Sequence, residues 1–126
     1  MFWDQGNQSG GLTSLRDDEE IGGGRAICCA ACGHRVTTAA ERVDVDGTHE
    51  HHCVNPHGHA FHFGCFAHAP GCTPLGEQNT YWSWFPGYRW QLEHCGGCGD
   101  HLGWLFTTNQ HRFHGLILDR LVERKE

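Results

Sequence analysis

The chain has 126 residues and a formal net charge of −6, with eight cysteines and twelve histidines, and a chain of this length forms one domain with a modest core. Its nine Lys and Arg residues are too scattered for the basic patch that nucleic-acid binding requires, so nucleic acid is excluded as a partner. No apolar run is long enough to cross a bilayer, which excludes a membrane-spanning protein.

The sequence also indicates a compartment. The N-terminus lacks a basic segment followed by an apolar stretch, so we expect no secretory signal. We therefore expect a cytoplasmic protein, because thiols stay reduced inside the cell. In that setting the cysteines indicate metal ligands or free thiols before they indicate disulfides.

Along the chain, residues 1–24 are predicted to be a disordered N-terminal segment, since Gln, Asn, Ser, Gly and an acidic run leave few apolar side chains to bury. Residues 25–126 are predicted to form the domain, mainly β in class. Strands are expected at 42–45, 52–54, 59–66, 88–94, 101–107 and 113–118, with an Asp46-Gly47 hairpin turn, loops marked by Pro70, Gly71, Pro74 and Gly76, and a helical or frayed tail at 119–126.

Two Cys-x-x-Cys-Gly motifs carry the strongest chemical signal: Cys29 with Cys32, and Cys95 with Cys98. Two residues between thiolates let one tight turn present both sulfurs to a single ion, and the glycine after them lets the turn bend. Two such pairs supply the four ligands of one structural zinc ion, whose closed coordination supports the fold rather than catalysis. The alternatives are Cys28 in place of Cys29, and a redox disulfide within one pair.

The remaining cysteines and the histidines give a weaker indication of function than the two Cys-x-x-Cys-Gly motifs. Buried thiols are expected at Cys53, Cys65 and Cys72, the alternative being that one is a nucleophile with a histidine as base. Six histidines crowd residues 49–62, where His49 and His51 would share one strand face and His57 and His59 a face of the next. We expect these histidines to be solvated, with a second metal site as the alternative.

Four of the five tryptophans lie between residues 82 and 104. Pro86-Gly87 imposes a turn between Trp84 and Trp90, and Trp104 and Phe106 alternate on a later strand so that both point to one face. The second cysteine motif lies between these segments and brings them side by side. The cluster is therefore either a dense core or an open aromatic box.

These motifs together resemble the CULT domain, the thalidomide-binding domain of cereblon, which also occurs alone in bacteria. The resemblance covers residues 27–118 and rests on Cys29-Ala-Ala-Cys32, Val54-Asn-Pro-His-Gly58, Ser83-Trp-Phe-Pro-Gly-Tyr-Arg-Trp90, Cys95 to Trp104, and Phe113-His-Gly-Leu116. It implies a β-tent of two antiparallel sheets pinned by the four-cysteine zinc. It further implies a cage whose walls are Trp84, Trp90, Trp104 and Phe106.

The resemblance also implies a function: a non-enzymatic domain that binds cyclic imides, such as glutarimide and thalidomide-type drugs, cyclised C-terminal Gln or Asn of peptides, and uridine-type rings. The imide edge would meet the backbone at Trp82 and the buried indole N–H of Trp84, with Asn55 at the pocket mouth. Trp82 stands where the cereblon domain has histidine, which makes the rim bulkier. The regions that attach full-length cereblon to a ubiquitin-ligase adaptor are expected to be missing from this chain.

Two other functions share parts of this pattern. Methionine-R-sulfoxide reductases combine a β-tent with two Cys-x-x-Cys pairs, but their Arg-Tyr/Phe-Cys-x-Asn motif is not in the sequence. A cage for methylated lysine or quaternary ammonium would use cation–π attraction with a carboxylate nearby. Glu93 and Asp100 are close in sequence, yet they flank the second cysteine motif, and strand alternation places Glu93 on the opposite face from Trp90.

Overall fold

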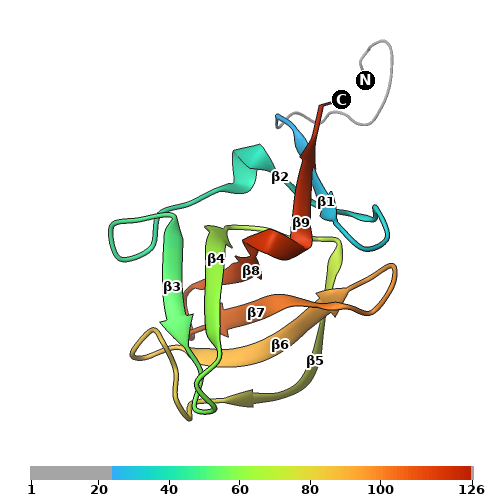
Figure 1. Ribbon diagram of the computed structural model, residues 1–126. Coiled ribbons are helices and arrows are strands. Elements are labelled where there is room, and N and C mark those ends of the chain that lie inside the picture. Colours follow the sequence, from blue (N-terminus) through green and yellow to red (C-terminus); the bar gives the residue numbers. More distant parts are fainter. Residues whose placement is uncertain (1–23, 126) are drawn as a thin grey trace.

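The computed structural model describes residues 24–125, so the segment predicted to be disordered lies, except for Gly24, outside the described residues. Within this range nearly all regular structure is β-strand (Figure 1). The strands are β1 (Ala26–Cys29), β2 (Arg35–Thr38), β3 (Glu50–Val54), β4 (Ala60–Phe66), β5 (Cys72–Asn79), β6 (Arg89–Cys95), β7 (His101–Thr107), β8 (Arg112–Ile117) and β9 (Leu121–Arg124), with short 3-10 turns η1 (Ala39–Glu41) and η2 (Leu118–Arg120). A search of these residues for a helix able to span a membrane found none.

The strands form two antiparallel sheets. The smaller has the order β2-β1-β9 and the larger has the order β3-β4-β8-β7-β6-β5. In Figure 1 the three-stranded sheet lies above the six-stranded one. This arrangement confirms the predicted mainly β class and the two-sheet β-tent, and the expected strands over residues 52–66, 88–107 and 113–118 are found within one or two residues of their predicted bounds.

Strand β7 shows why the large sheet forms where it does. Its residues from Leu102 to Phe106 are all buried, and the strand lies between β6 and β8. A strand covered on both faces reads as a continuous apolar run rather than as an alternation. Trp104 and Phe106 still point to one face and Leu105 to the other, because side chains alternate along a strand.

Strand β5 corrects one prediction. Pro74 and Gly76 were expected to mark loops, but both lie within this strand. The strand is at the edge of the large sheet, where proline is tolerated because its missing N–H would face solvent. Gly76 has φ +85° and lies where the pairing with β6 shifts between Leu75 and Asn79, so it supplies a bulge conformation that other residues rarely adopt.

The C-terminal segment is a second correction. Residues 121–124 were expected to be a helical or frayed tail, but they form β9, which pairs with β1 along its whole length. Residues 42–45 contain isolated bridges instead of a strand, although the hairpin turn after them is confirmed, with φ 52° at Asp46 and φ 88° at Gly47.

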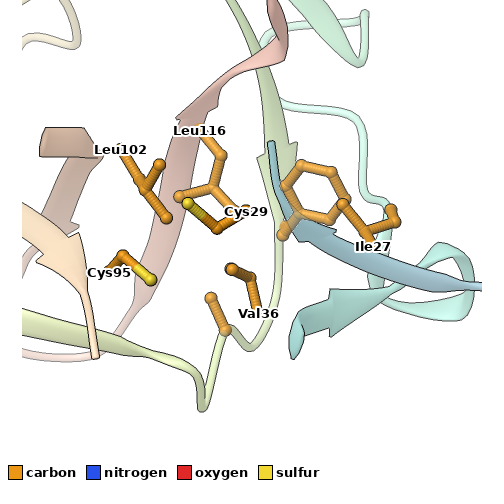
Figure 2. Close-up of a cluster of buried hydrophobic side chains, with 8 residues drawn as sticks. Ile27, Cys29, Val36, Cys95, Leu102 and Leu116 are labelled. Carbon is orange, nitrogen blue, oxygen red and sulfur yellow. The ribbon is translucent and has the colours of Figure 1, made fainter. Parts of the chain in front are cut away.

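Two apolar clusters hold the molecule together. The first contains residues of both sheets and includes two of the predicted metal ligands; Figure 2 shows Cys29 and Cys95 in this cluster with Ile27, Val36, Leu102 and Leu116. The second is almost wholly aromatic and includes Phe63, Phe85, Trp104, Phe106 and Phe113, with Trp84 and Trp90 packed against it. The first cluster therefore lies at the cysteines and the second at the tryptophans.

Candidate functional site

The structure brings the four predicted cysteine ligands together. Their sulfur atoms all lie within 4.8 Å of one another, with 3.8 Å between Cys29 Sγ and Cys98 Sγ and 3.6 Å between Cys32 Sγ and Cys95 Sγ. Tetrahedral zinc with bonds of about 2.3 Å places its sulfur ligands about 3.8 Å apart. The cluster therefore has the dimensions of a four-thiolate metal site, and it joins the β1–β2 turn to the β6–β7 turn.

The two motifs fold into the same turn. Gly33 N–H donates to Cys29 O at 2.8 Å, and Gly99 N–H donates to Cys95 O at 2.9 Å. Both glycines have positive φ, +80° and +85°, a conformation that costs glycine little. The glycine after each Cys-x-x-Cys pair is thus required by the turn that presents both sulfurs to one point.

Backbone amides also face the sulfurs. Gly97 N–H donates to Cys95 Sγ at 3.3 Å, and His34 N–H donates to Cys32 Sγ at 3.4 Å. Burial opposes ionisation of Cys95, but donors from the Cys98 and Gly97 backbone and from the Cys32 and Cys29 thiols outweigh it and lower the pKa of Cys95 to about 7. The same contacts between thiols raise the pKa of Cys32 and Cys98, so Cys95 ionises before either of them. A thiol that ionises near neutral pH is ready to bind a metal ion.

The other cysteines lie outside this group. Cys28 is buried and not among the clustered ligands, so the arrangement agrees with Cys29 as the ligand; all eight cysteines are free of disulfides. Burial raises the pKa of Cys53, Cys65 (to about 12) and Cys72. These three thiols stay protonated at neutral pH, which disfavours a nucleophile among them.

The tryptophan window encloses a cavity of about 450 Å³. All six residues predicted for ligand binding line it. The full lining is Asn55, Pro56, His57, Phe61, Asn79, Tyr81, Trp82, Trp84, Trp90, Leu92, His101, Trp104 and Phe106. The volume is in the range typical of sites for small organic ligands.

The cavity walls are fixed by ring packing. Trp84 and Trp104 meet edge to face, with ring centroids 4.9 Å apart, and Phe61 meets Trp104 in the same way at 5.0 Å. Trp104 is 6% exposed and Phe106 only 1%, whereas Trp82 is 51% exposed. The sequence left core and pocket as alternatives. The inner rings serve as both, since Trp104 and Phe106 belong to the buried aromatic cluster and also line the cavity.

The indole N–H groups differ from expectation. Trp84 Nε1–H was expected to be satisfied by a bound imide, but it donates to Val54 O at 2.9 Å. Trp82 Nε1–H donates to the same oxygen, also at 2.9 Å, and Trp90 Nε1–H donates to Tyr81 O at 2.7 Å. The two bonds to Val54 O tie the β5–β6 loop to the end of β3, a contact between distant segments that sequence spacing does not reveal.

The side chain of Asn55, at the pocket mouth, stabilises the turn that contains it. Its Oδ1 accepts hydrogen bonds from His57 N–H at 3.0 Å and His59 N–H at 2.9 Å. These bonds close the β3–β4 turn in the manner of an Asx-turn. The side-chain NH₂ is the group that Asn55 can offer to a ligand.

Several lining residues were not singled out in the sequence. Leu92 lies two residues after Trp90 and pairs with Trp104 on the neighbouring strand. Strand alternation could therefore have predicted that it lies on the same face as Trp90. His101 had no such signal, because the β6–β7 register shifts between Glu93 and His94. Tyr81 and Phe61 reach the cavity from a loop and a distant strand.

The cavity has no acidic wall. None of the described residues that line it carries a carboxylate. Glu93 is 1% exposed, and its Oε1 lies 2.7 Å from Nδ1 of His114. The pairing of Glu93 with Gly103 puts it on the other face from Trp90, as alternation predicted.

His101 gives a pH prediction. Burial lowers the pKa of its imidazole, the hydrogen bond with Gly103 O partly opposes this, and the charges of Arg120 and His94 lower the pKa further. The unfolded chain therefore binds this proton more readily than the folded one, and stability should fall as pH drops below the unfolded value of about 6.5. We expect His101→Gln to flatten the decline in melting temperature between pH 7.5 and 5.5. Both proteins keep the four cysteines, so parallel curves would contradict this role of His101.

Comparisons with known proteins agree with the motifs. The chain is 33% identical over 107 residues to protein cereblon of Gallus gallus, covering 79% of this chain and 24% of that protein. It is 30% identical over 105 residues to protein cereblon of Danio rerio, covering 77% and 24%, and 38% identical over 86 residues to that of Drosophila melanogaster, covering 64% and 14%. No family model matches the chain. The chain thus spans about a quarter or less of the length of these relatives, and it is a homologue of the CULT domain of cereblon.

Proposed function

We propose that residues 25–126 form a small-molecule binding domain whose aromatic cavity takes neutral cyclic imides, with glutarimide as the simplest member. The observation that carries this proposal is an aromatic cavity whose described lining has no carboxylate. A cation cage gains from a nearby acidic group, whereas a flat neutral ring needs only apolar walls and a few polar contacts. Thalidomide-type drugs, cyclised C-terminal residues of peptides and uridine carry the same imide edge.

The walls suit such a ring. Its methylene groups would lie against Trp84, Trp90 and Trp104, with Phe106 beneath. The packed rings leave little to order on binding, and a preformed site avoids that entropic cost. The imide edge offers an N–H between two carbonyl oxygens, and these groups are to be met by the Trp82 backbone, the Trp84 indole and the Asn55 amide.

A ligand can replace Val54 O as the acceptor of the Trp84 indole N–H at little energetic cost. Val54 O accepts from both Trp84 and Trp82. When a ligand oxygen takes the Trp84 N–H, Val54 O keeps its bond to Trp82. No polar group loses its only partner, so the ligand bond is not offset by an unsatisfied carbonyl.

We also propose that the four cysteines hold one zinc ion. The sulfur separations and the N–H groups of Gly97 and His34 directed at sulfur fit this ion. Four thiolates leave no open position for water or substrate, so the ion's contribution is to join the two sheets. Cys29, Cys32, Cys95 and Cys98 are the residues that would bind it.

The test is a titration of the zinc-loaded protein with glutarimide, followed by tryptophan fluorescence and by calorimetry. We expect a change in emission with measurable heat, and no competition from choline. An unchanged spectrum with no heat would refute the imide proposal, and displacement by choline would favour a cation cage. A methionine sulfoxide assay with added reductant should show no turnover, since none of the described residues that line the cavity is a cysteine.

A further inference from the structure

The fold sorts the crowded histidines of residues 49–62 into different environments. His51 stacks on Phe63 with centroids 5.6 Å apart, and His49 meets Phe66 edge to face at 5.3 Å. His57 and His59 precede β4 and lie in the turn, not on a shared strand face as predicted. The two remaining histidines, one on β3 and one on β4, come together on the outer face of this hairpin.

These two are His52 and His62. They are directly opposite each other in the antiparallel pairing of β3 and β4, and both are exposed. Their imidazole rings are stacked, with centroids 4.1 Å apart and planes inclined by only 8°. Two nitrogen ligands on one metal ion lie about 3.3 Å apart when each bond is about 2.0–2.1 Å and the geometry is tetrahedral. Imidazole lone pairs lie in the ring plane, and two nearly parallel planes do not meet at one ion. Binding therefore requires both exposed side chains to rotate until their nitrogen atoms reach that separation.

A carboxylate completes the arrangement. His62 Nε2 lies 2.7 Å from Glu50 Oε1, and Glu50 is two residues before His52 on the same strand face. A proton on Nε2 that is donated to this carboxylate leaves the lone pair on Nδ1. Metal-binding histidines characteristically donate their second nitrogen in this way, which orients the ring and raises its basicity.

We propose that His52 and His62 form a second, surface metal site for a nitrogen-preferring divalent transition ion, with Glu50 as the residue that positions His62. The site is independent of the imide cavity and of the four-cysteine cluster. That cluster is the only preassembled group of three or more ligands in the described part of the chain, so the histidine site supplies two protein ligands and water supplies the others. Imidazole suits Ni²⁺, Cu²⁺ and Zn²⁺, and carboxylate with water alone would not select them.

The experiment is a Ni²⁺ titration of the zinc-loaded full chain by calorimetry, with histidine ring resonances followed by NMR. We expect one Ni²⁺ per chain, with the first perturbations at His52 and His62. Removing either nitrogen ligand, His52→Ala or His62→Ala, should weaken Ni²⁺ binding by at least about tenfold. Glu50→Gln should weaken it by roughly tenfold, as loss of an orienting partner does elsewhere.

A matched control is available in the same molecule. His68 Nδ1 lies 2.8 Å from Glu41 Oε1, so it is another exposed histidine paired with a carboxylate, but no described histidine stacks on it. We expect His68→Ala to leave Ni²⁺ binding unchanged. Equal losses in His68→Ala and His52→Ala, or no Ni²⁺ bound by the wild type, would overturn the proposal. The circular-dichroism melting curve of each variant verifies that it is folded.

Discussion

Cys95→Ser is expected to remove the metal and to unfold the domain. Binding of structural zinc by small domains contributes on the order of 10–16 kcal/mol, which is comparable with the whole stability of a typical domain, about 5–15 kcal/mol. Cys95 lies on β6, whereas Cys29 and Cys32 of the same cluster lie at the β1–β2 turn, so loss of an ion held between them should separate the two sheets. Zinc content and the circular-dichroism melting curve measure the effect.

The matched control is Cys65→Ser. Cys65 is 0% exposed and Cys95 is 3% exposed, so both substitutions place a hydroxyl in a buried site, but Cys65 lies outside the metal cluster. We expect Cys65→Ser to keep zinc and a cooperative melt at reduced temperature. A chelator should reproduce the Cys95→Ser result on the wild-type protein. If Cys95→Ser retained one zinc per chain and melted like Cys65→Ser, the four-thiolate assignment would be wrong.

The second large effect is expected for the cage. Trp84→Ala and Trp104→Ala should reduce glutarimide affinity by at least about 30-fold while zinc is retained, because truncating an aromatic hot spot costs about 2 kcal/mol or more. Trp84 is the cleaner test, since it is half-buried and its indole N–H is the proposed ligand donor. Calorimetric affinity and zinc content are the two measurements.

Trp104 needs a stability control. It is buried against Phe61 and Phe63, and its removal should also destabilise the fold by about 3–5 kcal/mol. Leu105→Ala removes a neighbouring buried side chain that points to the opposite face and does not line the cavity. We expect Leu105→Ala to melt earlier yet bind glutarimide with nearly wild-type affinity. Comparable binding losses in the two variants would show that destabilisation, not loss of the cage wall, caused the effect.

The largest differences between expectation and structure are at positions where distant segments pair. Residues 121–124 have no strand pattern strong enough to stand alone, and they become β9 because β1 offers an open edge. Pro74 fits within a strand because that strand is at the edge of the six-stranded sheet, and the position of this edge depends on how all six segments pair. The partner of the Trp84 indole is Val54 O, thirty residues earlier in the chain. Each of these contacts depends on a pairing partner that cannot be identified from the local sequence.

Features that depend on short residue spacing could be predicted from the sequence alone. The two Cys-x-x-Cys-Gly turns, the Asp46-Gly47 hairpin turn and the shared face of Trp104 and Phe106 follow from a few neighbouring residues, because turn geometry and strand alternation act locally. Two features could not be predicted without the fold: the tryptophan rings are both core and cavity wall, and His52 lies opposite His62. These outcomes depend on sheet register, in which a shift of one residue moves every side chain to the other face.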